Sequence, residues 1–473
     1  MTTRTISAAH LFADLPPVWP EDPLPLIRQI LATRPEKLVV LDDDPTGTQT
    51  VYDIPVLTCW DVNSLRDEFR RAGSCCYLLT NSRSLPPQQA HRVNVEIAEN
   101  LAIASRQAAG RYALVSRSDS TLRGHYPVET DALSAAVGPF AATIIAPYFD
   151  AGGRYTVRDL HYVADGDRLI PAAETPFAGD AVFGYRHSNL REWVAEKTQG
   201  RISATQVHSV SIDMLRTGTF EHGPAQSVAT YLLSLPRGSV CIVNACHPRD
   251  MELFALGTLL AEQGGVRFLY RTAAQFVAAR LGLPPLSLWR PESTSRGTRT
   301  GGLLIVGSHV PQTTEQLQQL LQDSSLVAVE LSVQQLFDAE RHRTIDSVVS
   351  RVNETIGSGR DVVVYTSRQL ASVGDARDNL QIGQSISAAL VEVVRQLKSR
   401  PRFLVAKGGI TSSDVATRGL NVRRAMVRGQ VLPGVPVWEL GPETNFPGLM
   451  YIVFPGNVGG PESLTQVVQI LRS

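Results

Sequence analysis

Short aliphatic runs alternate along the chain with longer stretches in which apolar residues recur every three or four positions. The short runs are typical of buried parallel strands, and the longer stretches are typical of amphipathic helices. Their alternation predicts an α/β fold with mainly parallel sheets. In the first half, the predicted strands are Leu38–Leu41, Cys76–Thr80, Ala113–Ser116, Thr143–Ala146 and Val240–Asn244, and the predicted helices are Ser64–Arg71 and Gln88–Gln107.

A second series of the same kind follows Trp289–Gly301, a polar and basic stretch without periodicity that is typical of an inter-domain connection. By contrast, Ala151–Gln206 is rich in glycine, arginine and aromatic residues and only weakly periodic, so we interpret it as irregular and as part of a substrate-covering segment. In the second half, the predicted strands are Leu303–Val306, Val327–Leu331, Val362–Thr366, Phe403–Ala406, Val435–Leu440 and Met450–Phe454, and the predicted helices are Thr313–Leu321, Ile345–Ile356, Ile386–Leu397 and Glu462–Leu471.

Length and composition agree with two domains. The chain has 473 residues, which is too many for one hydrophobic core, and its 43% hydrophobic and 19% charged residues are typical of a globular enzyme rather than a disordered protein. We therefore predict an N-terminal domain over residues 1–285 and a C-terminal domain over residues 286–473.

Charge and cysteine content exclude several classes of protein. Lys+Arg and Asp+Glu are both 45, so no overall field attracts nucleic acid or an anionic membrane. Met1–Asp14 lacks the long apolar core of a signal peptide, and no later run approaches the length of a membrane span, so we expect a cytoplasmic protein. The five cysteines lack the spacing of a zinc site or a disulfide scaffold, and Cys75 and Cys76 are expected to be small buried side chains in a reducing compartment.

Polar residues cluster where the predicted strands end, which is where ligands bind in open α/β sheets. The first cluster is Asp42-Asp43-Asp44-Pro45-Thr46-Gly47. Pro45 and Gly47 shape a loop, and three adjacent carboxylates repel one another unless a cation, a substrate hydroxyl or backbone donors lie between them. Two interpretations stay open, an Asx-type turn that caps backbone amides and a role in binding or deprotonating a hydroxyl.

Two further clusters follow the next strands, Asn81–Ser84 with Ser82 and Arg83, and Ser116–Gly124 with Asp119 and Arg123. An arginine among small hydroxyls suits a carboxylate, because guanidinium binds it through two parallel hydrogen bonds. Each cluster alone is equally compatible with a generic polar loop. Three polar loops at successive strand ends, with Pro147–Arg154 as a fourth candidate, predict one shared polar crevice.

The second half has three glycine-rich strand exits, at Gly307-Ser308, at Lys407-Gly408-Gly409 and at Pro455-Gly456. Such turns present backbone N–H groups and helix N-termini to an anion, although none has the pattern of a Walker or dinucleotide-binding loop. Together they predict a cradle for nucleotide phosphates. Lys407 could contact a phosphate, but a lone lysine beside two glycines is expected to face solvent. The histidines His125, His161, His187 and His309 show no metal-ligand spacing, and we expect structural roles for them.

These motifs occur in the order found in a known family. The chain resembles the four-carbon acid sugar kinase family from about Leu38 to the C-terminus. The resemblance rests on Asp43-Asp44-x-Thr46-Gly47, Asn81–Pro87, Ser118–Gly124, Gly153-Arg154-x-Thr156-Val157, His161–Val163, Gly307-Ser308, Lys407-Gly408-Gly409-x-Thr411 and Gly456-Asn457, of which Asp-Ser-Thr-Leu-Arg-Gly is the most specific.

The resemblance implies a kinase with its active site in the inter-domain cleft. An N-terminal domain would bind a four-carbon sugar acid such as threonate, erythronate or an oxo-tetronate, and a C-terminal domain would bind ATP with Mg²⁺. A homodimer is compatible with this interpretation. The implied nucleotide-binding residues are Ser308, Gly408, Gly409, Ile410, Thr411 and Gly456, and the implied substrate-side residues are Asp43, Asp44, Ser82, Arg83, Asp119 and Arg123.

Within this site, Arg83 and Arg123 are our choices for the substrate carboxylate, and either Asp43 or Asp44 would accept or orient the hydroxyl proton. The chain departs from the family pattern at Pro45, Thr48, Arg117-Ser118, His187–Leu190 and Ile410. Two other classes stay open. One is a catalytically silent protein that binds sugar acid or nucleotide in a regulatory or interaction role. The other is a nucleotide-dependent dehydrogenase, which the absence of G-x-G-x-x-G disfavours.

Overall fold

The computed structural model divides the chain into two compact units. Unit 1 consists of Met1–Val51 and Cys59–Pro285, and unit 2 consists of Tyr52–Thr58 and Leu286–Ser473. The structure describes residues 5–34, 36–218, 223–285, 287–291, 300–338, 340–368 and 376–473, with the side chains of 376–382 left out. Most of the predicted inter-domain connection, residues 292–299, therefore lies outside the described residues.

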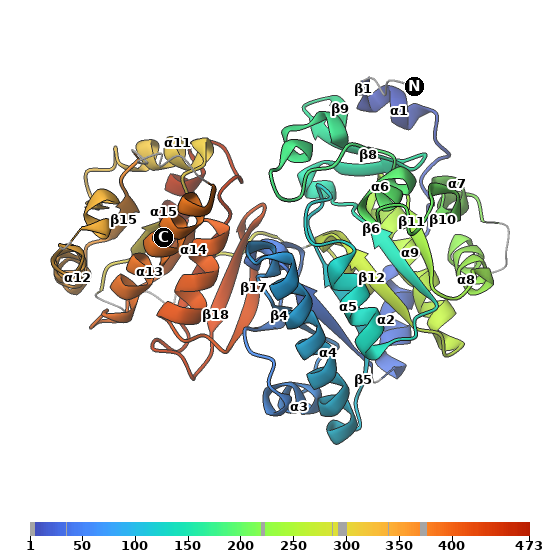
Figure 1. Ribbon diagram of the computed structural model, residues 1–473, viewed down its shortest axis with the longest axis horizontal. Coiled ribbons are helices and arrows are strands. Elements are labelled where there is room, and N and C mark those ends of the chain that lie inside the picture. The colour runs from blue at the N-terminus through green and yellow to red at the C-terminus, as the bar shows by residue number, and fades with distance from the viewer. Residues whose placement is uncertain are drawn as a thin grey trace. The chain divides into compact units, whose positions relative to one another are not determined.

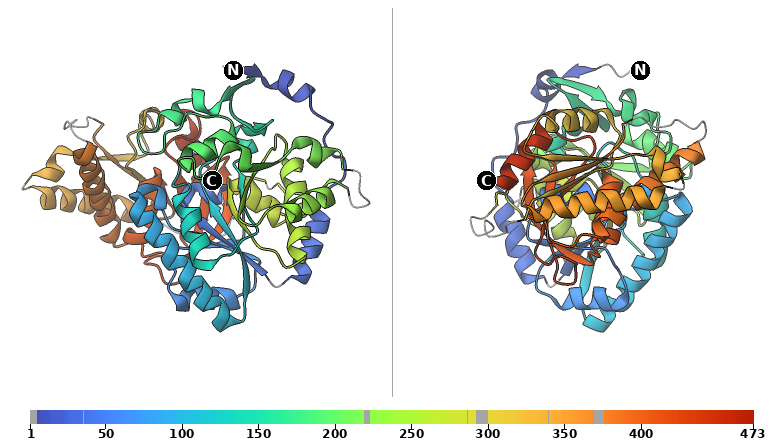
Figure 2. Two further views of the ribbon diagram at one scale, coloured as in Figure 1. Left: turned by 45° about the vertical axis from the view of Figure 1, so that its right-hand side comes forward. Right: turned by 90° about the vertical axis from the view of Figure 1, so that its left-hand side faces the viewer.

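Unit 1 is built on a parallel sheet with the strand order β10-β11-β6-β12-β5-β2-β4. All five residues of β4 are buried, as expected for a strand covered on both faces. Helices α3, α4 and α5 lie on one face of this sheet, and α2, α9 and α10 lie on the other (Figures 1 and 2). The strands are β2 (Glu36–Asp42), β4 (Cys75–Leu79), β5 (Arg111–Arg117), β6 (Ala142–Ala146), β10 (Val207–Val210), β11 (Ser239–Val243) and β12 (Phe268–Thr272).

Only two helices of unit 1 were predicted from the sequence, over 64–71 and 88–107, and the observed α3 and α4 begin and end close to these positions. The helices of unit 1 are α1 (Ala8–Ala13), α2 (Leu24–Thr33), α3 (Val62–Arg70), α4 (Pro87–Ala108), α5 (Val128–Val137), α6 (Leu190–Lys197), α7 (Ile212–Arg216), α8 (Pro224–Ser234), α9 (Pro248–Gln263) and α10 (Ala274–Arg280).

The expectation that Ala151–Gln206 is irregular is wrong. This stretch contains α6 and the strands β7 (Arg154–Val157), β8 (Leu160–Asp165) and β9 (Arg168–Pro171). Together with β1 (Ile6–Ser7), these strands form an antiparallel sheet of order β1-β9-β8-β7. Arg158 and Asp159, both with positive φ, connect β7 to β8 in a two-residue turn that matches the twist of a hairpin. Tyr162 and Leu169 of the sheet then pack against Leu11 of α1.

The sheet of unit 2 has the order β3-β17-β18-β19-β16-β13-β15-β14, with antiparallel pairing from β3 to β19 and parallel pairing from β19 to β14. Its strands are β3 (Ile54–Leu57), β13 (Leu303–Val306), β14 (Val327–Leu331), β15 (Val362–Thr366), β16 (Leu404–Lys407), β17 (Arg424–Leu432), β18 (Val435–Leu440) and β19 (Met450–Phe454). Its helices are α11 (Pro311–Leu320), α12 (Arg341–Gly357), α13 (Ala376–Arg395), α14 (Gly409–Asp414) and α15 (Ser463–Arg472).

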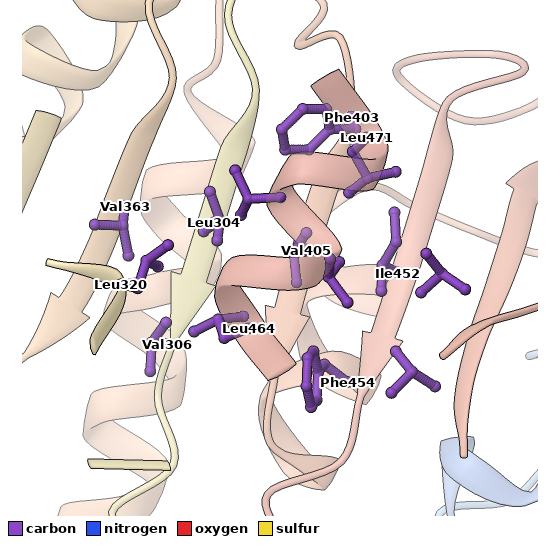
Figure 3. Close-up of a cluster of buried hydrophobic side chains, with 14 of the residues drawn as sticks. Leu304, Val306, Leu320, Val363, Phe403, Val405, Ile452, Phe454, Leu464 and Leu471 are labelled. Atoms are coloured by element: carbon purple, nitrogen blue, oxygen red, sulfur yellow. The ribbon is translucent and has the colours of Figure 1, made fainter. Parts of the chain in front are cut away.

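Aliphatic side chains of these strands form the core of unit 2 (Figure 3). Leu304, Val405 and Ile452, from three neighbouring strands, pack against Leu464 and other residues of α15. Removing one such buried leucine side chain typically costs 2–5 kcal/mol, roughly. The glycine-rich turns at the strand ends are thus supported by a dehydrated core.

One short segment of the N-terminal sequence belongs to unit 2. β3 pairs antiparallel with β17, and the segment Tyr52–Thr58 around it is assigned to unit 2 although residues on both sides of it belong to unit 1. The predicted ranges 1–285 and 286–473 differ from this division at that segment. Neither β3 nor β17 was predicted from the sequence.

The predicted α/β class with mainly parallel sheets and two domains is confirmed. Cys75 and Cys76 are buried, as expected. Among the described residues, no helix combines the length and the apolar character that crossing a membrane would require.

Candidate functional site

Charged residues of unit 1 meet where β2, β4, β5 and β12 end. In the strand register, Asp42 is the neighbour of Arg117, and Arg117 is the neighbour of Thr272. The loop residues that follow these strands therefore share one edge of the sheet. The structure brings together Asp43, Asp44, Ser82, Arg83, Asp119 and Arg123, all predicted from the sequence.

Asp43 is held by protein donors on both carboxylate oxygens. Arg83 donates from Nη2 to Oδ1 at 2.5 Å and from Nε to Oδ2 at 3.1 Å, and Ser118 Oγ lies 2.9 Å from Oδ2. The Asp43 residue is only 2% exposed. Such a bidentate pair fixes the orientation of both partners. Two of the donors of Arg83 are consequently engaged within the protein.

Asp44 combines the two interpretations that the sequence left open. Its Oδ1 accepts hydrogen bonds from the backbone N–H of Thr46 at 2.9 Å and from Thr46 Oγ1 at 2.5 Å, which is the capping arrangement of an Asx turn. Its Oδ2 lies 3.7 Å from Arg83 Nη1, and no hydrogen bond from a described residue reaches it. Burial raises the pKa of Asp44, but Arg83 and the two Thr46 hydrogen bonds outweigh it and hold the pKa below its usual value. An ionised carboxylate oxygen is thus left for a ligand.

The side chain of Asp42 packs against the turn at Gly47. Arg117 Nη1 donates to its Oδ1 at 3.1 Å, while its buried Oδ2 has no hydrogen-bond partner among the described residues. Burial raises the pKa of Asp42 to about 7. A Cβ at position 47 would lie 2.1 Å from this Oδ2, so only glycine fits where the turn crosses the carboxylate. This contact explains why the motif needs Gly47.

Asp119 and Arg123 form a pair of their own. Arg123 Nε donates to Asp119 Oδ2 at 2.7 Å, and Thr121 Oγ1 donates to the same oxygen. Burial alone would raise the pKa of Asp119, but Arg83 and Arg123 lower it well below its usual value. The guanidinium of Arg123 also lies over the Phe177 ring, 5.1 Å from its centroid.

Sequence reasoning missed two residues of this network. Arg271 on β12 is 2% exposed and donates from Nη2 to Ser118 Oγ at 3.2 Å, with Trp193 5.1 Å from its guanidinium carbon. Glu129 accepts a hydrogen bond from Ser82 Oγ, and burial raises the pKa of Glu129 to about 7. Ser82 is therefore turned toward Glu129 in this structure. An arginine inside an apolar strand was the available signal for Arg271.

His125 and His161 are buried and hydrogen-bonded, as expected for structural histidines. His161 contacts Thr156 Oγ1 through Nδ1 at 2.9 Å and the carbonyl oxygen of Ser120 through Nε2 at 2.8 Å. Burial lowers the pKa of His161 to about 4, so the ring stays neutral. This histidine therefore ties the Asp119–Arg123 loop to the small sheet.

In unit 2 the glycine-rich turns converge. A Cβ at Gly408 would lie 3.0 Å from Ser308 Cβ and 3.3 Å from Thr411 Oγ1, and a Cβ at Gly456 would lie 3.0 Å from Ser308 Oγ. Gly408 has φ +118°, and Gly409 begins α14. Four of the predicted nucleotide residues, Ser308, Gly408, Thr411 and Gly456, are thus in close proximity. Ile410, also predicted to bind the nucleotide, is 56% exposed.

Lys407 lies beneath these turns and not in solvent, so the expectation of a solvent-facing lysine is wrong. It is 0% exposed, its Nζ donates to the carbonyl oxygen of Pro455 at 2.5 Å, and it lies 3.9 Å from the centroid of the Phe454 ring. Burial lowers the pKa of Lys407 to about 7. The sequence also missed Arg368, whose Nη1 donates to the carbonyl oxygen of Ser308 at 2.7 Å.

Two family models match the chain. A sugar-binding N-terminal domain matches residues 38–280, and a nucleotide-binding C-terminal domain matches residues 303–464. A D-threonate kinase of Cupriavidus necator is 26% identical over 76% of this chain and 78% of its own length. A 3-oxo-tetronate kinase of the same organism is 26% identical over 82% of this chain and 85% of its own length. A D-erythronate kinase of Heliobacterium modesticaldum is 25% identical over 63% of this chain and 62% of its own length.

Solved structures share the fold. A Salmonella typhimurium LT2 protein aligns with a TM-score of 0.66 at 16% identity over 91% of this chain and 98% of its own. A Haemophilus influenzae protein aligns with a TM-score of 0.61 at 18% identity over 92% of this chain and 100% of its own. With the matched domain models and the motifs in family order, these findings lead to one conclusion: the chain belongs to the four-carbon acid sugar kinase family.

Proposed function

We propose that this protein is a kinase that transfers the γ-phosphoryl group of ATP to a hydroxyl of a four-carbon sugar acid. The observation that carries the proposal is Oδ2 of Asp44, an ionised carboxylate oxygen that accepts no hydrogen bond from the described residues and lies 3.7 Å from the guanidinium of Arg83 at the carboxyl edge of a parallel sheet. Relatives named as kinases of threonate, erythronate and 3-oxo-tetronate support the substrate class.

In this proposal Asp44 orients the hydroxyl and receives its proton. The hydroxyl oxygen attacks the γ-phosphorus, the bond from that phosphorus to the bridging oxygen breaks, and ADP leaves. Phosphoryl transfer depends mainly on position and charge neutralisation, so a weakly basic carboxylate is sufficient. Asp43, with both oxygens engaged by Arg83 and Ser118, would hold the loop in place.

The converging turns of unit 2 are our candidate for the ATP phosphates. Close approach of backbone at Gly408 and Gly456 suits a phosphate, and the N-terminus of α11 adds a positive helix end next to Ser308. Mg²⁺ stays a prediction. Within the described ranges no group of three or more His, Cys, Asp or Glu forms a cage, which fits an ion that arrives on the nucleotide and needs only one or two protein ligands. When bound, it would neutralise phosphate charge.

Transfer requires the hydroxyl and the γ-phosphate to meet away from water, because exposed ATP would be hydrolysed. The inter-domain cleft and the homodimer stay predictions. Small-angle scattering with and without ATP and sugar acid would test closure, and sedimentation equilibrium would test the dimer.

The kinase proposal is tested by measuring ADP release with ATP and each stereoisomer of threonate and erythronate and the oxo-tetronates. We expect one of these acids to be phosphorylated, and Asp44→Asn to lower kcat by about 100-fold or more, within the usual range for a positioned acid or base. Asp67→Asn, at an exposed aspartate of α3, is the matched control. No turnover with any of them, or full kcat in Asp44→Asn, would refute the proposal, and calorimetric binding without turnover would favour the silent binding protein.

A further inference from the structure

Arg154 takes no part in the reaction proposed above, although it belongs to the family motif Gly153-Arg154-x-Thr156-Val157. It begins β7, and its backbone is fixed by hydrogen bonds in both directions with Phe149, at 3.0 Å and 2.9 Å. Phe149 follows β6, whose carboxyl end belongs to the same sheet edge as the candidate site. The position of Arg154 is therefore set by the frame of unit 1.

The side chain of Arg154 lacks the partners that the neighbouring arginines have. Arg83 and Arg123 each pair with aspartates, and Arg271 is hydrogen-bonded and stacked. Arg154, in contrast, forms no ion pair with a described residue, and none of the described residues accepts a hydrogen bond from its buried Nε. A partly buried guanidinium without an anionic partner is unfavourable unless a ligand supplies one.

A shared aromatic ring brings Arg154 together with Arg123. The guanidinium carbons of Arg154 and Arg123 lie 5.5 Å and 5.1 Å from the centroid of the Phe177 ring. Burial lowers the pKa of Arg154, the charge of Asp119 opposes this, and Arg123 lowers it further. Two like charges at one ring repel each other, and an anion bound between them would relieve that repulsion.

We propose that Arg154 and Arg123, oriented by Phe177, form an anion subsite that binds the carboxylate of the sugar acid. This inference rests on the proposed function. A planar guanidinium held against an aromatic ring can present a pair of N–H donors, which matches the geometry of a carboxylate. Asp119 is in electrostatic range of Arg83, Arg123 and Arg154, so the subsite adjoins the Asp43–Arg83 pair.

The roles of the arginines then divide. Arg83, which holds Asp43 and lies near Asp44, serves the hydroxyl end of the substrate. Arg154, with Arg123, serves the acid end. The subsite gives a physical reason for selecting a sugar acid over a neutral polyol, because a polyol would leave the Arg154 charge without a partner.

The test compares Arg154→Gln and Arg154→Lys with Arg168→Gln, at an exposed arginine on β9 of the same small sheet. For the accepted acid, we expect Arg154→Gln to raise KM by about 10- to 100-fold, as a charged hydrogen bond is lost, with a smaller change in kcat. Arg154→Lys should recover part of the loss. The preference for the acid over threitol or erythritol should fall in Arg154→Gln and stay unchanged in Arg168→Gln.

Chemical labelling of the unaltered protein tests the subsite even if the Arg154 variants do not fold. Phenylglyoxal labelling of Arg154, read by peptide mass spectrometry, should slow in the presence of the acid and not in the presence of threitol. An unchanged KM in a folded Arg154→Gln variant, or labelling that the acid does not slow, would overturn the subsite and leave Arg154 as a packing partner of Phe177.

Failure of the kinase proposal can be distinguished from failure of the Arg154 subsite proposal. A protein that binds a tetronate without releasing ADP contradicts the kinase activity, while loss of that binding in Arg154→Gln still supports the subsite. A protein that binds no four-carbon acid contradicts both.

Discussion

Replacing Lys407 by methionine measures how much the burial of the Lys407 ammonium group reduces the free energy of unfolding. Burial lowers the pKa of Lys407 from 10.5 to about 7, and the side chain is 0% exposed, so solvent screening does not reduce the effect. This lowering of the Lys407 pKa corresponds to about 5 kcal/mol of free energy. Below pH 10.5 the unfolded chain binds more protons than the folded protein at this site, so stability rises with pH from about 7 to 10.5.

The penalty is about 4 kcal/mol at pH 7 and about 2 kcal/mol at pH 9. These values are upper limits, because the carbonyl oxygen of Pro455 and the ring of Phe454 stabilise the charged form. Lys407→Met should therefore gain stability over the unaltered protein at pH 7, and this gain should shrink by about 2 kcal/mol by pH 9. Lys398→Met, at an exposed lysine of unit 2, should show no such trend.

Urea unfolding at pH 7, 8 and 9 measures the difference between each variant and the unaltered protein. Because the sequence contains only four lysines, a ¹³Cε-lysine NMR titration can also resolve the group directly. The resonance that disappears in Lys407→Met should titrate near pH 7. A titration midpoint above pH 9.5, or a stability difference that does not change with pH, would refute the reasoning.

Two further predictions concern unit 1. Gly124 and Gly73 have nearly the same φ, +116° and +117°, but a Cβ at Gly124 would lie 2.5 Å from Ser118 Oγ whereas one at Gly73 meets nothing within 4 Å. Gly73→Ala should cost about 1–2 kcal/mol of backbone strain. Gly124→Ala should cost more in thermal unfolding and also reduce activity, and equal costs would contradict the steric argument. For Glu129→Gln, burial raises the pKa of Glu129 to about 7, so the folded protein binds the extra proton between pH 4.5 and 7. The unaltered protein should lose stability relative to this variant as pH rises through that window, and a constant difference would show that Glu129 ionises normally.

The elements that the sequence predicted well include strands that begin and end with aliphatic residues or threonine and lie between polar stretches. Leu303–Val306, Val327–Leu331 and Val362–Thr366 were predicted and observed with the same bounds. The first and third read as continuous apolar runs because they are parallel strands inside the sheet, whereas Val327–Leu331 is an edge strand that alternates buried and exposed residues. β12 was missed because Arg271 interrupts the run, and its charge is accommodated by aromatic faces that lie far away in the sequence. In the small sheet, the two-residue Gly166-Asp167 turn between β8 and β9 was the hairpin signal that was overlooked.

For the candidate site, the sequence identified the cluster but not its internal pairing. The run of aspartates was expected to need a cation, a substrate hydroxyl or backbone donors between its carboxylates, and in the structure Arg83 and Arg117 pair with Asp43 and Asp42. Which carboxylate pairs with which arginine depends on the order of strands in the sheet, and that order cannot be read from local patterns. Lys407 was misjudged for a related reason, because the turn that covers it is nearly fifty residues away. The roles proposed for Arg83 and Arg123 in substrate binding stay predictions.

The position of β3 limits how the protein can be divided. The chain enters unit 2 after Val51, contributes Ile54–Leu57 as the neighbour of β17, and returns at Cys59. A fragment ending at residue 285 would retain that strand without its partner, and a fragment beginning at 286 would have an open β17 edge prone to self-association. Expressing unit 2 as an independent module would therefore require the seven-residue segment Tyr52–Thr58 to be joined to it, and expressing unit 1 would require that segment to be removed.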